Sequence, residues 1–206
     1  FCKALPGFLW SEAFNMGYFS YYFLIAIVVV FYFLCKYERF ERAAFIIIAS
    51  FFIYYLIYIF LPVTGPQYYF NAIGLQNAFA GHFPAVGHYF QTHMEMLPTQ
   101  GNPPGLFFHL VEDSQAAGER PTAAFPSSHV GMSTIVMILA WKGRKSLFWG
   151  MLPFYILLCC ATVYIQAHYL IDAICGFASA WIVYWLTGRM FERIHDGIFP
   201  TGERIS

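Results

Sequence analysis

Long, nearly uncharged stretches dominate this chain. Five of them approach the roughly 20 apolar residues that a helix needs to cross a bilayer, and together they hold one acidic or basic side chain, Asp172. The strands of membrane barrels are shorter and alternate between apolar and polar residues, so these stretches indicate helices. The expected spans are 18–35, 43–61, 123–141, 147–166 and 169–188.

The composition indicates the same class of protein. Hydrophobic residues make up 59% and charged residues 11% of the 206 residues, whereas soluble domains have about 25% charged residues. The formal net charge of zero argues against a nucleic-acid partner. We therefore expect one all-α polytopic membrane helix bundle over residues 1–206, embedded in the lipid bilayer. Because the chain begins with Phe1, we expect its natural start to lie outside this sequence.

Basic residues predict the orientation of the spans, because loops rich in Lys and Arg stay in the cytoplasm. Nine of the 11 basic residues follow the first, third or fifth span, so one side of the membrane carries nearly all of them: Lys36, Arg39, Arg42, Lys142, Arg144, Lys145, Arg189, Arg193 and Arg204. The connection 62–127 and the turn 166–170 are then expected on the extracytoplasmic side, either periplasmic or lumenal. We expect interfacial helices within that long connection.

Two polar clusters lie at membrane depth, where ionisable groups are costly and mark functional sites. Residues 120–129 enter the third span, and residues 168–172 join the fourth span to the fifth, both on the extracytoplasmic side. His168 and Asp172 are four residues apart, a spacing that places both on one face of a helix. The carboxylate can then fix one ring nitrogen and leave the other as a nucleophile, although a structural pair explains the spacing equally well.

The other cluster has the features of a helix start, with Pro126 in the first turn and Ser127 and Ser128 able to cap it. Free amides and the helix dipole at such a start favour a phosphate, and His129 would lie beside it, where it can exchange a proton. A simple cap is an equal alternative for this motif alone. Together, an anion site, two histidines and a carboxylate on one membrane face predict phosphoryl transfer through a phosphohistidine.

The same residues carry a family resemblance. Phe-Pro-Ser-Ser-His-Val-Gly at 125–131 and His-Tyr-Leu-Ile-Asp at 168–172, followed by Gly176, resemble two signature motifs of the type 2 phosphatidic acid phosphatase superfamily. They look most like those of its inositol phosphorylceramide synthase branch. The resemblance covers roughly residues 43–190. It implies six spanning helices, so one N-terminal span would be missing here.

The resemblance also implies roles for individual residues. His168 would be the nucleophile that becomes phosphorylated, and Asp172 would orient it. His129 would protonate the leaving oxygen and then activate the acceptor. Ser127, Ser128 and the amides that follow would hold the phosphoryl oxygens.

This sequence departs from the family pattern in its cations. Ala161-Thr162 stands where the third motif has a Ser-Arg pair, and the segment near 65–67 lacks the basic residues of the first motif. Arg120 is the only Lys or Arg of the connection 62–127 and thus the best candidate for a phosphate-binding side chain. The alternative is that Arg120 is a solvated loop charge beside Glu119. One arginine balances a phosphodiester monoanion better than a phosphomonoester dianion, because unbalanced buried charge is costly.

We therefore expect an integral-membrane enzyme that cleaves a phosphoester of a membrane lipid and passes the head group to ceramide or another lipid alcohol. The alternative is a plain lipid phosphate phosphatase acting on phosphatidate or an isoprenyl (pyro)phosphate. A lipid transporter fits less well, because the sequence shows no repeated halves. His88, His93 and Glu95 match no metal motif, so we expect no metal and no other cofactor. The sequence leaves the oligomeric state open.

Overall fold

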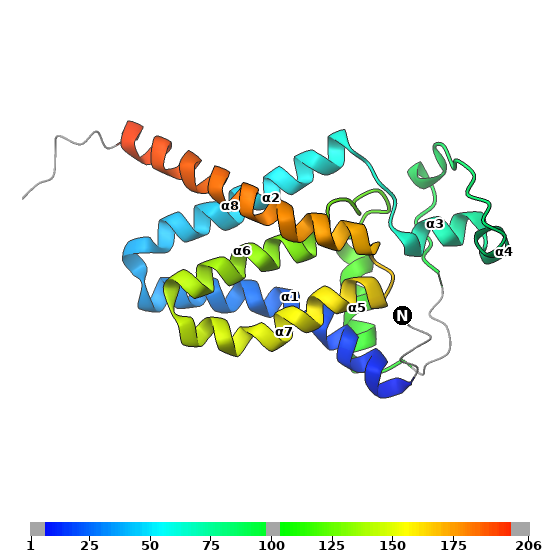
Figure 1. The fold of residues 1–206 in the computed structure, drawn as a ribbon, viewed down its shortest axis with the longest axis horizontal. Coiled ribbons are helices and arrows are strands. Elements are labelled where there is room, and N and C mark those ends of the chain that lie inside the picture. Colours follow the sequence, from blue (N-terminus) through cyan, green and yellow to red (C-terminus); the bar gives the residue numbers. More distant parts are fainter. Residues whose placement is uncertain (1–6, 98–103, 199–206) are drawn as a thin grey trace, which may run out of the picture.

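The computed structural model describes residues 7–97 and 104–198, and within these ranges its regular structure is helical apart from one β-bridge between Val63 and Ala123. The expected all-α class is confirmed. The helices of the bundle are α1 (Phe8–Cys35), α2 (Phe40–Phe60), α6 (Ser128–Gly143), α7 (Lys145–Tyr164) and α8 (Leu170–Ile198) (Figure 1). A short 3-10 helix, η2 (Tyr37–Arg39), links α1 to α2.

Among the residues that the structure describes, four helical segments are long and apolar enough to cross a membrane, which makes the chain an integral membrane protein: α1, η2 with α2, α7, and α8. The remaining expected span corresponds to α6, which has only 16 residues and a length of about 24 Å at 1.5 Å per residue. It begins at Ser128 instead of residue 123, because the chain before it runs alongside Val63 and Ala124 donates a 3.0 Å hydrogen bond to the carbonyl of Val63.

Helix α6 is the centre of the bundle. Every residue from Val130 to Ala140 is buried, and the helix contacts α1, α2, α7 and α8 (Figure 1). Gly131 allows one of these contacts, because a methyl group there would collide with the phenol of Tyr54 on α2. Close packing around small residues is the usual source of stability between helices in a membrane. The first turn of α6 is thereby held in a fixed position.

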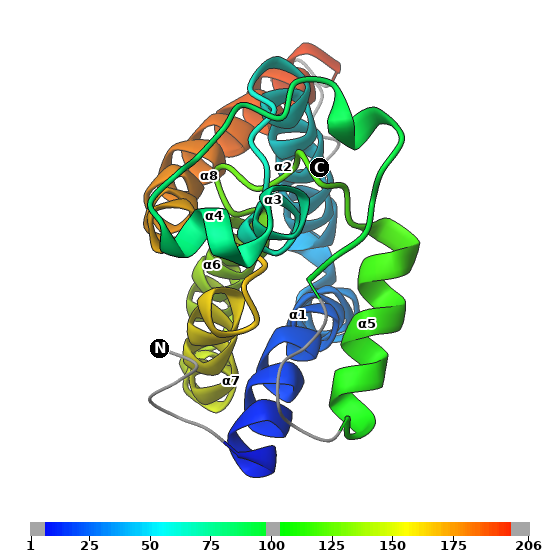
Figure 2. The ribbon, with the colours of Figure 1, turned by 90° about the vertical axis from the view of Figure 1, so that its right-hand side faces the viewer.

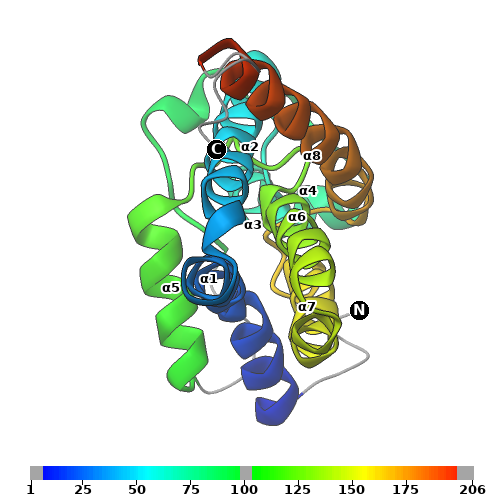
Figure 3. The same ribbon diagram turned by 90° about the vertical axis from the view of Figure 1, so that its left-hand side faces the viewer.

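Helix α1 starts at Phe8, ten residues before the apolar stretch expected from the sequence. Glu12 lies in this extension, and its two carboxylate oxygens accept hydrogen bonds from the backbone amides of Phe107 (2.9 Å) and Phe108 (3.0 Å). These amides open helix α5 (Leu106–Gly118), whose N-terminus favours a negative charge. Helix α5 therefore lies beside α1 (Figures 2 and 3).

The connection between α2 and α6 covers one end of the bundle. Besides α5 it contains α3 (Pro66–Ile73), α4 (Leu75–Phe79) and the 3-10 helix η3 (Tyr89–Gln91) (Figure 2). It is bonded to the turn between α7 and α8, since the amide of Gln67 donates a 3.1 Å hydrogen bond to the carbonyl of Gln166. This end of the bundle brings together the two polar clusters that are 40 residues apart in the sequence.

Candidate active site

The ring of His168 lies in the turn between α7 and α8 and is 5% exposed. Its Nδ1 atom is 2.9 Å from the carbonyl oxygen of Ala124. Because a carbonyl can only accept, Nδ1 carries the hydrogen in the neutral ring and Nε2 keeps a free lone pair. Burial lowers the pKa of His168 to about 4, although its bond to the carbonyl acts in the opposite direction. The residue is therefore an unprotonated base at neutral pH.

Asp172 lies near His168, but not in the way that the spacing predicted. Helix α8 begins at Leu170, so His168 precedes the helix and the two residues do not share a helical face. The Nδ1 atom of His168 is 3.9 Å from Oδ2 of Asp172, which is longer than a hydrogen bond. The Oδ2 atom of Asp172 instead accepts a 2.8 Å hydrogen bond from the amide of Tyr169, as in a capping box. The carbonyl of Ala124 makes the bond that the carboxylate was expected to make.

Ser127 caps α6, as the sequence predicts. Its hydroxyl accepts a 3.3 Å hydrogen bond from the amide of Val130, and its own amide donates a 3.0 Å bond to the main-chain oxygen of Asp172. The side chain is fully buried. Gly176 permits this contact between α6 and α8, because a methyl group there would collide with the carbonyl oxygen of Ser127. The motif therefore joins the two polar clusters through the backbone.

Several amides at the start of α6, those of Ser128, Val130 and Gly131, already have partners within the protein. The phenol of Tyr58 accepts a 2.9 Å hydrogen bond from the amide of Ser128 and donates a 2.9 Å bond to the carbonyl of Pro126. The amide of Val130 is bound to Ser127. A phosphate at this helix start would therefore meet the half-buried Ser128 side chain and the remaining first-turn backbone rather than four free amides.

His129 faces His168 across the site, with 5.8 Å between the ring centroids. Its ring lies between Tyr18 and Tyr21 of α1, whose centroids are each 4.6 Å away. The Tyr18 hydroxyl is 3.4 Å from Nδ1 of His129. Sequence reasoning missed Tyr18, because nothing in an apolar stretch distinguishes a tyrosine that faces a site more than 100 residues away.

Glu119 is a second residue that sequence reasoning missed. Its Oε1 atom is 4.0 Å from Nε2 of His129 and accepts a hydrogen bond from the Tyr18 hydroxyl. The amide groups of Gln67 and Gln115 each donate a 3.2 Å bond to Oε2. Burial raises the pKa of Glu119, while these hydrogen bonds act to lower it. The only signal in the sequence was a carboxylate just before the motif that contains His129.

The geometry therefore brings the two histidines close together with their ring planes tilted by 60°, each near a carboxyl group, at one end of a membrane helix bundle. A family model described as the PAP2 superfamily matches residues 9–186. The chain belongs to the PAP2 superfamily. This membership confirms the family resemblance at the superfamily level and makes the protein a phosphatase-type lipid phosphoesterase. No curated protein and no solved structure matches the chain.

Within the described structure of this PAP2 protein, the side chain of Arg120 makes no hydrogen bond or ion pair with His129 or His168. Its side chain is exposed, and its guanidinium donates to the sulfur of Met94 at 3.7 Å. It lies in the connection between α2 and α6, immediately after Glu119, whose carboxylate turns inward. The two neighbouring charges thus face different surroundings.

Metal-ligating groups do not cluster in the part of the PAP2 chain that the structure describes: no set of three His, Cys, Asp or Glu side chains is arranged to hold an ion. Two histidines of the connection between α2 and α6 make local contacts instead. His88 lies 3.2 Å from the amide of Gln91, and His109 lies 3.6 Å from Glu112.

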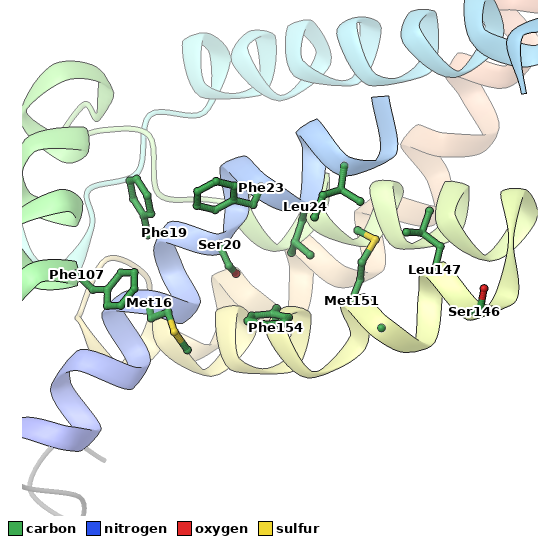
Figure 4. A pocket seen from close by; sticks show the side chains of 12 residues that line it. Met16, Phe19, Ser20, Phe23, Leu24, Phe107, Ser146, Leu147, Met151 and Phe154 are labelled. Atoms are coloured by element: carbon green, nitrogen blue, oxygen red, sulfur yellow. The ribbon is translucent and has the colours of Figure 1, made fainter. Parts of the chain in front are cut away.

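A cavity of about 510 Å³ lies between α1 and α7 (Figure 4). Its lining is almost entirely apolar and includes Met16, Phe23 and Phe154. It opens on a different face of α1 from the site, because residues two positions apart, such as Met16 and Tyr18, point to nearly opposite sides of a helix. None of the expected site residues lines it.

Proposed function

We propose that this protein moves the head group of a phosphodiester membrane lipid to a second lipid alcohol through a phosphohistidine on His168. One observation supports this proposal most directly. The hydrogen bond from Nδ1 of His168 to the Ala124 carbonyl leaves the lone pair of Nε2 available, and the His129 ring lies 5.8 Å away. A fixed nucleophile opposite a group that can exchange protons is the arrangement that covalent phosphoryl transfer needs.

In the first step, Nε2 of His168 attacks phosphorus, and the bond from phosphorus to the donor's lipid alcohol breaks. His129 gives its proton to the departing oxygen, so the lipid alcohol leaves neutral. The intermediate holds the head group on a phosphorus–nitrogen bond. In the second step, His129 takes the proton of the acceptor hydroxyl, whose oxygen attacks phosphorus and releases His168.

The charges around the site support a phosphodiester as the donor. Glu119 and Asp172 place two carboxyl groups near the histidines, at 4.0 Å and 3.9 Å. Arg120 is directed towards Met94. A phosphomonoester would bring a second negative charge into these poorly solvated surroundings, where unbalanced charge costs several kcal/mol. A phosphodiester brings only one, which Arg120 could balance by turning inward.

The remaining roles follow from the contacts. Ser127 keeps α6 in place by capping it, and Ser128 offers a hydroxyl to a phosphoryl oxygen. Asp172 stabilises the positive charge that His168 acquires when its Nε2 becomes phosphorylated. The acceptor is ceramide or another lipid alcohol, and the reaction takes place at the extracytoplasmic face.

Product analysis by mass spectrometry tests the proposal. Wild type and His168→Ala are purified and incubated with phosphatidate, phosphatidylinositol and ceramide. We expect wild type alone to transfer an intact head group to ceramide. Release of inorganic phosphate from phosphatidate that clearly exceeds any transfer would make the protein a lipid phosphate phosphatase and reject the charge argument.

A further inference from the structure

We propose that Glu119 is the positioning residue of His129: its carboxylate holds the ring in place and favours the protonated form that gives a proton to the leaving oxygen. This inference rests on the proposed function, in which His129 is the acid and base. It concerns a residue outside both signature motifs.

The position of the carboxylate is determined by three donors from three different parts of the chain. Tyr18 of α1 binds Oε1, while Gln67 of α3 and Gln115 of α5 bind Oε2. Neither oxygen is left to rotate freely, so the distance from Oε1 to Nε2 of His129 is held at 4.0 Å. Burial raises the pKa of Glu119, and the three hydrogen bonds oppose this shift because they stabilise the ionised carboxylate.

The site is enclosed enough for this charge to matter. The exposed fractions of the side chains are 15% for His129 and 20% for Glu119. Water screens such a pair less than a pair at the surface, and a carboxylate close to an imidazole favours the imidazolium. Burial by itself disfavours a charged His129 ring. A negative charge on Glu119 thus offsets part of this cost.

The other titratable groups around His129 do not supply this charge. Tyr18 and Tyr21 face it from α1, and His168 faces it from the turn between α7 and α8. Two phenols and a second imidazole carry no negative charge at neutral pH. Tyr58 of α2 bonds to the neighbouring Ser128 amide. Glu119 adds the carboxyl group that faces His129, at 4.0 Å from Nε2.

The Tyr18 hydroxyl connects the two residues, since it donates to Glu119 and lies 3.4 Å from Nδ1 of His129. Tyr18→Phe removes this link and leaves the carboxylate in place. We expect a smaller loss of rate from Tyr18→Phe than from a change that neutralises Glu119.

The test is the pH dependence of kcat/KM for wild type and Glu119→Gln, measured on the lipid mixture used for the proposed function. Glu119→Gln removes the carboxylate that faces His129 at 4.0 Å, so we expect the alkaline limb to move to lower pH by about 1 unit or more. We expect kcat at pH 7.5 to fall at least about tenfold, with little change in KM. Glu119→Asp keeps the charge and should keep the wild-type limb at a reduced rate.

Glu112→Gln is the matched control, because Glu112 lies 3.6 Å from His109 in an exposed pair on α5. It should leave the pH profile unchanged. An unshifted alkaline limb in Glu119→Gln, or identical behaviour of the Gln and Asp variants, overturns the inference. Such a result leaves the proposed function standing as long as His168→Ala is inactive; an active His168→Ala instead rejects the proposed function itself.

Discussion

The Nδ1 atom of His168 lies 2.9 Å from the carbonyl oxygen of Ala124, so the loop before α6 orients a histidine that is 44 residues further along the chain. The carboxylate of Asp172, four residues after His168, is 3.9 Å from the same nitrogen. The backbone of one motif thus orients the ring of the other, and the free Nε2 follows from this contact. The geometry of each motif therefore depends on the other being folded against it.

Replacing His168 by Ala should abolish turnover while the fold remains. His168 is the proposed nucleophile, so we expect product formation to fall by about a thousandfold or more. Mass spectrometry of the lipid products measures the loss, and thermal unfolding in detergent checks the fold. His109→Ala, at an exposed position on α5, should behave as wild type. Wild-type-like activity of His168→Ala is incompatible with the mechanism.

Changes at Asp172 should separate its charge from its role as a cap. In Asp172→Asn the side-chain oxygen can still accept from the Tyr169 amide, so we expect stability to stay within about 1 kcal/mol of wild type. The lost negative charge should lower kcat about tenfold or more, because phosphorylation of His168 makes its ring positive. Asp172→Ala should lose both stability and activity. An Asn variant with full activity would show that Asp172 acts only through the helix start.

The acid limb of the pH profile should lie well below the ordinary histidine range. The folded pKa of His168 is about 4, compared with an ordinary value of 6.5. Between these values the unfolded chain binds more protons. The free energy of unfolding therefore falls as His168 is protonated in the unfolded chain. The stability that the neutral, buried ring allows is fully present above pH 6.5 and decreases as the pH falls towards 4. Similarly, we expect kcat/KM at pH 5.5 to keep more than half its neutral value. A limb near pH 6.5 would contradict a buried, neutral His168.

Gly176→Ala should destabilise the protein by about 1–3 kcal/mol, the usual cost of overpacking. The new methyl group would collide with the Ser127 carbonyl oxygen and meet the Ser127 Cβ at 3.2 Å. Activity should fall with stability, because this contact positions the start of α6. Gly150→Ala on α7 is the control, since a methyl group there meets no atom within 4 Å. Equal melting temperatures for the two variants would rule out a packing role for Gly176.

Chelation should leave the activity unchanged. The proposed chemistry uses the two histidines as nucleophile and acid–base group, and no step needs a metal. Lipid turnover is compared before and after treatment with EDTA, followed by addition of Mg²⁺ or Zn²⁺. Strong inhibition that the added ion reverses would reject the metal-independent mechanism.

The sequence by itself determined the class of the protein and the identity of its central motifs. Apolar stretches that match the thickness of a bilayer predict membrane helices, because this property depends only on consecutive residues. Helix α6 shows the limit of this reasoning. Its apolar stretch begins at residue 123, but the helix begins at Ser128, where Ser127 and Tyr58 bind its first amides. Tertiary contacts therefore decided where the span starts.

Only the tertiary structure decided what surrounds the two histidines. Tyr18 and Glu119 meet His129 from α1 and from the end of α5, and the Ala124 carbonyl replaces Asp172 as the hydrogen-bond partner of His168. Glu119 and Arg120 are neighbours in the sequence, but the fold turns the carboxylate inward and directs the guanidinium to Met94. Local sequence specifies which side chains are available. Their partners, and hence their protonation, depend on contacts between residues far apart in the chain, which exist only when the helices pack together.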